Sequence, residues 1–329
     1  MRSNNKKPSP QRARGAKNRQ QTEAPTTATT PNEQIETEAP PPSGEKLQKV
    51  LARAGTGSRR EMERAISEGK VEVNGRKAKL GDRVSSSDKI VCNGRYISAS
   101  ERGNDHLRVL LYNKPEGEIC SHSDPEGRPS VFDKLPPLKS GRWISVGRLD
   151  FNTSGLLLFT TDGELANKLM HPSSNIDREY LVRINGSVDA DMLARLKEGV
   201  LLEDGVAKFT DIVVRASKGE TSNPWFYCVV MEGRTREVRR LWESQEVRVS
   251  RLKRVRYGNV FIPSHVRSGQ WIDLNDKEIG DIYETAGMKR PAVQTYSAKT
   301  IKERERHQRK LRSAPSKQHN PKARPSRRK

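Results

Sequence analysis

The segment VGRLDFNTSGLLLFTTDGELANKLMHP occupies residues 146–172 and places one acid, Asp150, at the head of a turn-forming cluster. The apolar run that follows has the length and composition of a buried strand. A second acid, Asp162, precedes a helical pattern and is predicted to cap that helix. Because aspartate at the first position of a turn commonly bonds its own backbone, this segment taken alone favours a structural role for Asp150.

Short strands and frequent turns continue on both sides of this segment. The pattern predicts strands at 107–112, 143–146, 156–160, 180–184 and 226–231, and helices at 164–170, 189–197 and 236–243. Strands predominate and hairpins fit the spacing, so we expect a mixed, mostly antiparallel α+β domain over residues 105–288. No glycine-rich phosphate loop occurs in the chain, which argues against a nucleotide cofactor.

A smaller module is predicted at residues 45–100. Two apolar helix stripes flank a glycine turn, Ser58 and Glu61 form a capping box, and Asn74-Gly75 predicts a tight hairpin. The two helices carry many cations, which an ordinary solvated face would also explain. Like charges on two packed helices favour a polyanionic partner, so we predict contact with RNA or DNA. The predicted contact residues are Lys46, Lys49, Arg53, Arg59, Arg60 and Arg64.

The charge of the chain points to nucleic acid. Its 329 residues include 62 Lys and Arg against 41 Asp and Glu, a net charge of +21. Much of this excess lies in two polar segments, 1–44 and 289–329, which have too few apolar residues to fold and are predicted to be disordered tails. Such a charge favours a partner that releases counterions on binding, as RNA does.

The remaining bulk features narrow the class of protein. No apolar run is long enough to span a bilayer and no amphipathic basic helix accompanies the tails, so we expect no membrane partner and a cytoplasmic location. The three cysteines, Cys92, Cys120 and Cys228, lie far apart and lack neighbours at metal-ligand spacing. They are predicted to be reduced thiols, with no metal bound. Nothing in the sequence requires more than a monomer.

Basic segments elsewhere in the chain favour a catalytic role for Asp150 over a purely structural one. EGRTREVRRLWE at 232–243 and RLKRVRYG at 251–258 are rich in arginine, and an acid in such a groove stays ionised and nucleophilic. Arg239 lies one position from the apolar stripe of its helix and is a natural partner. Tyr180 begins a strand. Its side chain could be buried in the core or could place its phenol ring beside a flat base, and the spacing favours neither interpretation.

These segments resemble a known family. SVGRLDFNTSGLLLFTTDGELANKLMHP is similar to the defining motif of the RsuA-type pseudouridine synthases, and REYLVRI, EGRTREVRRLWE and VSRLKRVRYGN resemble three further motifs in the expected order. EKLQKVLARAGTGSRREMERAISEGKVEVNG resembles the S4 RNA-binding module. The likeness covers about residues 45 to 288 and is greatest to the RluB branch. It implies a substrate in 23S rRNA, free or in a large-subunit assembly intermediate, and as target the uridine conventionally numbered 2605.

The resemblance also assigns roles to residues. Asp150 matches the catalytic aspartate of the family, Arg239 the basic residue that pairs with it, and Tyr180 the tyrosine that stacks on the base. Arg148 is placed to fill the gap that a flipped uridine leaves in the RNA. The implied reaction isomerises uridine to pseudouridine without a metal or a cofactor. Attack of the carboxylate on C1′ and removal of a proton from C2′ are both open routes.

Two other classes of protein stay open at this point. A catalytically silent S4-type assembly factor would bind ribosomal RNA with the same basic surface, as would a synthase for another rRNA uridine. A glycoside-type hydrolase would use Asp150 and Asp162 as paired carboxylates on one bond. The predicted cap role of Asp162 and the basic charge disfavour the hydrolase. The intact Asp150, Tyr180 and Arg239 set disfavours the silent factor.

Overall fold

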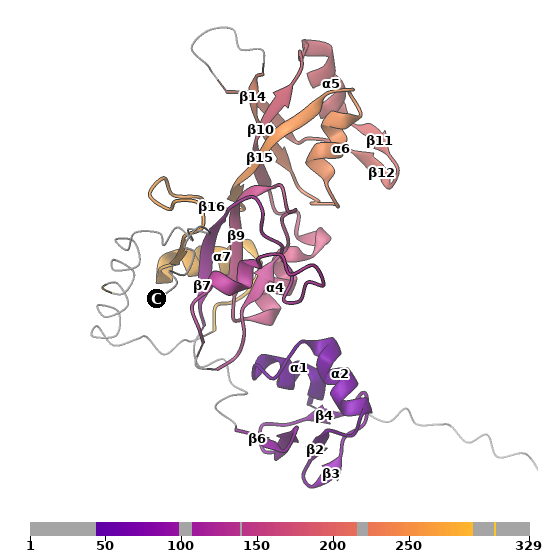
Figure 1. Cartoon of the computed structure of the whole chain (residues 1–329), viewed down its shortest axis with the longest axis vertical. Coiled ribbons are helices and arrows are strands. Elements are labelled where there is room, and N and C mark those ends of the chain that lie inside the picture. The colour runs from indigo at the N-terminus through magenta and orange to yellow at the C-terminus, as the bar shows by residue number, and fades with distance from the viewer. Residues whose placement is uncertain (1–43, 99–106, 139, 216–222, 292–305, 307–329) are drawn as a thin grey trace, which may run out of the picture. The chain divides into compact units, whose positions relative to one another are not determined.

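The computed structural model describes residues 44–98, 107–138, 140–215, 223–291 and 306 (Figure 1). Of the two predicted tails, the described residues are only Gly44, 289–291 and Arg306. The disorder of both tails therefore stays a prediction. Within the described residues no helix is long and apolar enough to cross a membrane.

The N-terminal module has two short helices on small sheets. Helices α1 (Leu47–Arg53) and α2 (Arg59–Ser67) pack together over a core of aliphatic side chains. Strand β1 (Glu45–Lys46) pairs with β4 (Arg83–Val84). A four-stranded antiparallel sheet has the order β3-β2-β5-β6, with β2 at Val71–Val73, β3 at Arg76–Lys77, β5 at Ile90–Cys92 and β6 at Arg95–Ile97.

Two local predictions for this module are confirmed. The Ser58 hydroxyl accepts from the backbone N–H of Glu61 at 3.1 Å, and the Glu61 carboxylate accepts from the Ser58 N–H at 2.6 Å. Asn74 and Gly75 have φ angles of 52° and 77°, as a two-residue hairpin turn between β2 and β3 requires. Both features depend on neighbours in sequence alone, which is why the sequence predicts them.

The larger domain is organised by one nine-stranded sheet. Its main order is β13-β14-β10-β15-β9-β7-β17, with β16 paired to β15 and β8 paired to β9. The strands are β7 Val109–Lys114, β8 Ile144–Val146, β9 Ser154–Thr160, β10 Arg178–Asn185, β13 Asp211–Val214, β14 Trp225–Val230, β15 Arg248–Tyr257, β16 Val260–Phe261 and β17 Trp271–Asp273. A separate hairpin joins β11 (Val200–Leu202) to β12 (Gly205–Ala207). The predicted α+β, mostly antiparallel fold is confirmed.

One parallel pair joins the two halves of this sheet. Strand β15 pairs with β9 through Lys253 opposite Ser154 and Arg254 opposite Gly155, whereas the other pairs of this sheet are antiparallel. Gly155 has φ +104°, and a Cβ there would lie 2.1 Å from the Arg254 carbonyl oxygen. Only glycine permits this approach, which brings the loop before β9 next to β15.

Helices cover the sheet on both faces. Alternate residues of β7 belong to two different cores: Leu110 and Tyr112 to one, Val109 and Leu111 to the other. Helices α5 (Ala190–Glu198) and α6 (Glu237–Glu243) contribute to the first core, and α4 (Gly163–Met170) and α7 (Asp276–Thr285) to the second (Figure 1). Short 3-10 turns occupy Val131–Lys134 and Pro172–Ser174. The sequence predicted α4, α5 and α6 to within one residue at each end but did not anticipate α7.

Candidate active site

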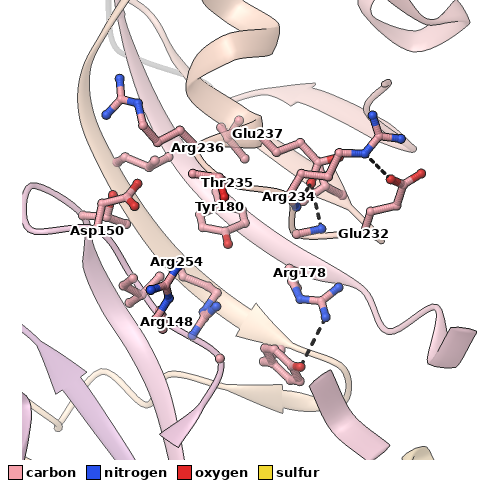
Figure 2. A pocket seen from close by; sticks show the side chains of 18 of the residues that line it. Arg148, Asp150, Arg178, Tyr180, Glu232, Arg234, Thr235, Arg236, Glu237 and Arg254 are labelled. Carbon is pink, nitrogen blue, oxygen red and sulfur yellow. Dashed lines mark hydrogen bonds and ion pairs between the residues drawn. The ribbon is translucent and has the colours of Figure 1, made fainter. Parts of the chain in front are cut away.

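A cavity of about 540 Å³ opens at the junction of the two halves (Figure 2). The loop between β8 and β9, strand β10, the segment 232–236 before α6, and strand β15 line it. Figure 2 shows the side chains of Asp150, Tyr180, Arg148 and Arg254 converging on this space. The parallel β9–β15 pair therefore creates the cavity by setting segments that are about a hundred residues apart side by side.

Asp150 combines a turn role with a side chain that faces the cavity. Its carbonyl oxygen accepts from the Thr153 N–H at 3.0 Å, so the turn predicted from the sequence is present. The half-buried side chain lines the cavity and forms no hydrogen bond or ion pair with another described residue. The structural and chemical interpretations are therefore compatible, because the backbone serves one and the carboxylate the other.

A buried lysine fixes this loop from behind. The Lys114 side chain is fully buried, and its Nζ donates to the carbonyl oxygens of Pro115, Asp150 and Thr153 at 3.0, 3.1 and 2.9 Å. Burial lowers the pKa of Lys114 from its ordinary value. Three carbonyl acceptors match the three donors of an ammonium group, so the lysine acts as a clamp on the loop.

Arg239 also binds the loop rather than the carboxylate. Its guanidinium donates to the Asn152 carbonyl oxygen at 2.9 Å and to the Val249 carbonyl oxygen at 3.1 Å. Burial lowers the pKa of Arg239 and the nearby Arg236 charge adds to this effect, whereas the Asp150 charge opposes it. Asp150 and Arg239 thus influence each other electrostatically, but among the described residues no hydrogen bond joins them. The expectation of direct pairing stays a prediction for the complex with substrate.

Tyr180 faces the cavity from β10. The Tyr180 side chain is 8% exposed and belongs to the same core as Leu110 and Tyr112. In the sheet, Tyr180 on β10 lies opposite Arg254 on β15. Leu252, Val230 and Leu149 give this part of the cavity an apolar wall. A phenol ring beside aliphatic side chains offers a flat surface that suits a nucleobase.

The cavity rim carries further arginines and one buried acid. Arg148 is exposed on the β8–β9 loop, as its predicted role beside the target requires. The buried Glu237 carboxylate accepts from the backbone N–H groups of Gly233 and Arg234 at 2.7 and 3.0 Å and so holds the segment before α6. Burial raises the pKa of Glu237, and these two hydrogen bonds oppose that rise.

Sequence reasoning missed three cations of the site, Lys114, Arg178 and Arg254. The RLKRVRYG run was noted for its charge, but not for which side chains point inward. Strand alternation from Leu252 would have placed Arg254 on the core face. For Lys114 and Arg178 the sequence offers no such signal, since a charged residue at the end of a strand usually faces solvent.

Asp162 lies outside the cavity and serves the fold. Its Oδ1 accepts from the N–H groups of Glu164 and Leu165 at 2.8 and 3.3 Å, and its Oδ2 accepts from the Tyr283 hydroxyl at 2.6 Å. Both carboxylate oxygens are thereby committed to the start of α4 and to α7. The cap prediction is confirmed, and paired-carboxylate hydrolysis with Asp150 has no structural basis.

Asp162→Ala is expected to lower the free energy of unfolding by about 2 kcal/mol, because the helix cap and the partner of a buried hydroxyl are lost together. Urea unfolding measures this. Tyr283→Phe, which removes only the second contact, should cost about half as much. The folded Asp162→Ala protein should keep its catalytic activity, and loss of that activity would contradict a purely structural role.

The predicted RNA-contact residues of the small module differ in availability. Lys46, Arg59, Arg60 and Arg64 are exposed. Lys49 and Arg53 are half-buried, and each forms an ion pair with Glu45, at 3.2 and 2.5 Å. The exposed four are therefore the better candidates for phosphate contact.

No group of three or more His, Cys, Asp or Glu side chains that could hold a metal ion occurs in the described part of the chain.

Comparison with known proteins identifies the family. The profile described as RNA pseudouridylate synthase matches residues 108–244, and the S4 domain profile matches residues 45–90. "Ribosomal large subunit pseudouridine synthase B" of Pseudomonas aeruginosa is 58% identical over 269 residues, which cover 82% of this chain and 69% of that protein. The chain belongs to the RNA pseudouridine synthase family. It is accordingly an isomerase.

Further relatives of this pseudouridine synthase agree. Proteins of the same name from Haemophilus influenzae and Escherichia coli O157:H7 are 55% and 58% identical, covering 76% and 70% of this chain and 70% and 80% of theirs. A solved structure titled "Crystal structure of pseudouridylate synthase" is similar with a TM-score of 0.51 at 25% identity, over 73% of this chain and all of that one. The S4 module and the synthase fold predicted from the sequence are thus confirmed.

Proposed function

We propose that this synthase converts one uridine of 23S rRNA to pseudouridine, in free RNA or in a large-subunit assembly intermediate. The observation that carries the proposal is the Asp150 carboxylate, which faces the cavity uncommitted beside Tyr180. The names of the relatives, ribosomal large subunit pseudouridine synthases, support a large-subunit substrate. The finer target we propose is the uridine conventionally numbered 2605, on the likeness to the RluB branch.

The reaction exchanges one bond of the nucleoside for another. The bond from N1 of uracil to C1′ breaks, the base rotates, and C5 joins C1′ while the C5 proton moves to N1. No electrons are gained or lost overall. Asp150 either adds to C1′ as the base departs or takes a proton from C2′, and a half-buried carboxylate on a clamped loop suits both.

Other residues of the site support this chemistry without entering it covalently. The Tyr180 ring stacks on the uracil and its hydroxyl is available for the C5 proton. Arg239 keeps the Asp150 loop in place through the Asn152 carbonyl. Leu252 and Val230 exclude water from the base while it is detached, which prevents its loss to hydrolysis.

The target uridine has to leave its stack before it can react. C1′ and C5 cannot both be reached inside a helix, and extruding a nucleotide costs a few kcal/mol. Arg148, exposed on the Asp150 loop, is placed to enter the gap that the uridine leaves. Phosphate contacts by the S4 module and by the cavity arginines would offset the cost.

The testing experiment is pseudouridine mapping on rRNA from cells that lack this gene. We expect one site in 23S rRNA to lose its modification, and to regain it with the wild-type gene but not with Asp150→Asn. Full modification of every site in the deletion strain would contradict the proposal. A site that Asp150→Asn restores would exclude the carboxylate and favour the catalytically silent factor that acts beside another enzyme.

The S4 module is expected to contribute electrostatic affinity. Changing Arg59, Arg60 and Arg64 together to glutamine should reduce the slope of log affinity against log salt by about 2, since three phosphate contacts are lost. Filter binding or fluorescence anisotropy over a range of salt concentrations measures the slope. Arg76→Gln with Lys77→Gln on β3 is the control for loss of charge away from the helices. An equal change in slope for the control would place the RNA elsewhere on the module.

A further inference from the structure

Two arginines are buried in the active-site cavity without an acidic partner. Arg254 is 2% exposed and Arg178 is 6% exposed, and both line the cavity. Within the described residues, neither guanidinium forms an ion pair with a carboxylate. A buried cation without a counterion costs several kcal/mol, so such a pair is unexpected in a site that serves only to bind a neutral base.

Backbone contacts hold both side chains in place. Arg254 donates from Nε to the Leu156 carbonyl oxygen at 2.7 Å. Arg178 donates to the carbonyl oxygens of Ile176, at 3.0 Å, and Met231. The Cζ atoms of the two arginines lie 5.3 and 5.2 Å from the centre of one aromatic ring, that of Tyr257. The orientation of each guanidinium is therefore set before any ligand binds.

Arg254 retains a donor that the protein does not use. Its Nη2 is buried and has no hydrogen-bond partner among the described residues. Leaving a buried donor unsatisfied is costly, and the neighbouring carbonyl of Leu156 is already occupied by Nε. Because Arg254 lines the cavity, this donor without a partner indicates an acceptor that arrives with the substrate and reaches Nη2 as the cavity wall adjusts.

The charge of the cavity lining agrees with an anionic acceptor. Glu232 pairs with Arg234 at 2.5 Å, and Glu237 is occupied by backbone N–H groups. Asp150 is then the one described carboxylate of the lining without a partner. The described lining arginines that lack a carboxylate partner are Arg148, Arg178 and Arg254. Positive charge is in excess, which favours an anion.

Arg254 lies where a nucleotide would bring such an anion. It is opposite Tyr180 across the β10–β15 pair and opposite Gly155 across the β9–β15 pair. A uridine with its base on Tyr180 and its sugar at Asp150 carries a phosphodiester on each side. We propose that Arg254, assisted by the charge of Arg178, binds a phosphate that flanks the flipped uridine. This inference rests on the proposed function.

The test replaces one phosphate at a time in an RNA substrate by a neutral methylphosphonate, 5′ or 3′ of the target uridine. For the wild-type protein, one of the two positions should weaken binding by about 10- to 100-fold, as for loss of a charge-assisted hydrogen bond. In Arg254→Gln the same replacement should weaken binding by less than about 2-fold, because its partner is gone. Arg236→Gln, an exposed arginine of the same cavity, should keep the full wild-type effect.

A second variant, Arg254→Lys, keeps the test valid if Arg254→Gln does not fold. Arg254→Lys keeps the charge but cannot donate to the Leu156 carbonyl and a phosphate in the same way, so its methylphosphonate effect should be intermediate. A wild-type-sized effect in both Arg254 variants would overturn the phosphate site. A fall in kcat alone, with the phosphate effect unchanged, would also overturn it and make Arg254 a partner of Asp150. Wild-type binding that shows the effect without forming pseudouridine would overturn the proposed function and leave the phosphate site standing.

Discussion

Asp150→Asn is expected to lower the rate of pseudouridine formation by at least about 10³-fold. The amide is nearly isosteric with the carboxylate, and the loop is held by backbone carbonyls, so the local structure should persist. What disappears is the negative charge that adds to C1′ or removes a proton from C2′. Single-turnover assays with the RNA substrate measure the rate, and the affinity for RNA should stay within about 3-fold, because one carboxylate contributes little to a polycationic surface.

Glu232→Gln is the matched control for this experiment. It makes the same carboxylate-to-amide change in the same cavity, but its carboxylate is committed to Arg234 on the exposed rim. We expect turnover within about 3-fold of wild type, as for most surface substitutions. Comparable losses in the two variants would mean that net charge, rather than the position of Asp150, governs the rate.

Lys114→Met is expected to have the largest effect on stability and to lower the free energy of unfolding by about 3 kcal/mol. The substitution keeps the side-chain volume but leaves the Pro115, Asp150 and Thr153 carbonyl oxygens without this donor. Unsatisfied buried acceptors cost about 1–3 kcal/mol each, and Asp150 retains its bond from Thr153. Turnover of the folded fraction should fall by about 10²-fold, because a shift of the loop moves the carboxylate off the sugar.

Urea unfolding and single-turnover kinetics in parallel test both parts of this prediction. Lys168→Met, at an exposed position of α4, is the control for replacing a lysine by methionine. It should change stability by no more than about 0.5 kcal/mol. A Lys114→Met protein that is as stable as wild type would show that water or a shifted backbone satisfies the carbonyls, and that the clamp is dispensable.

Features that depend on neighbours in sequence were predictable. The Ser58 capping box, the Asn74-Gly75 hairpin and the Asp162 cap each involve residues within about four positions of one another, and all three are confirmed. The amphipathic periods of α4 to α6 placed these helices to within one residue. The fold class followed from the same alternation of strands and turns, and the family from the order of several long motifs.

Other features follow only from tertiary structure. Asp150, read locally, is a turn residue, and it becomes a cavity carboxylate because β9 pairs in parallel with a strand a hundred positions later. Likewise, Lys114 and Arg178 have charges that predict solvent exposure, yet the sheet buries both of them around the loop and the cavity. Sequence alone determined which groups are available for chemistry. Which of them lose their water, and therefore which charges seek a partner in the substrate, depends on contacts between distant segments, because burial is a property of the packed chain.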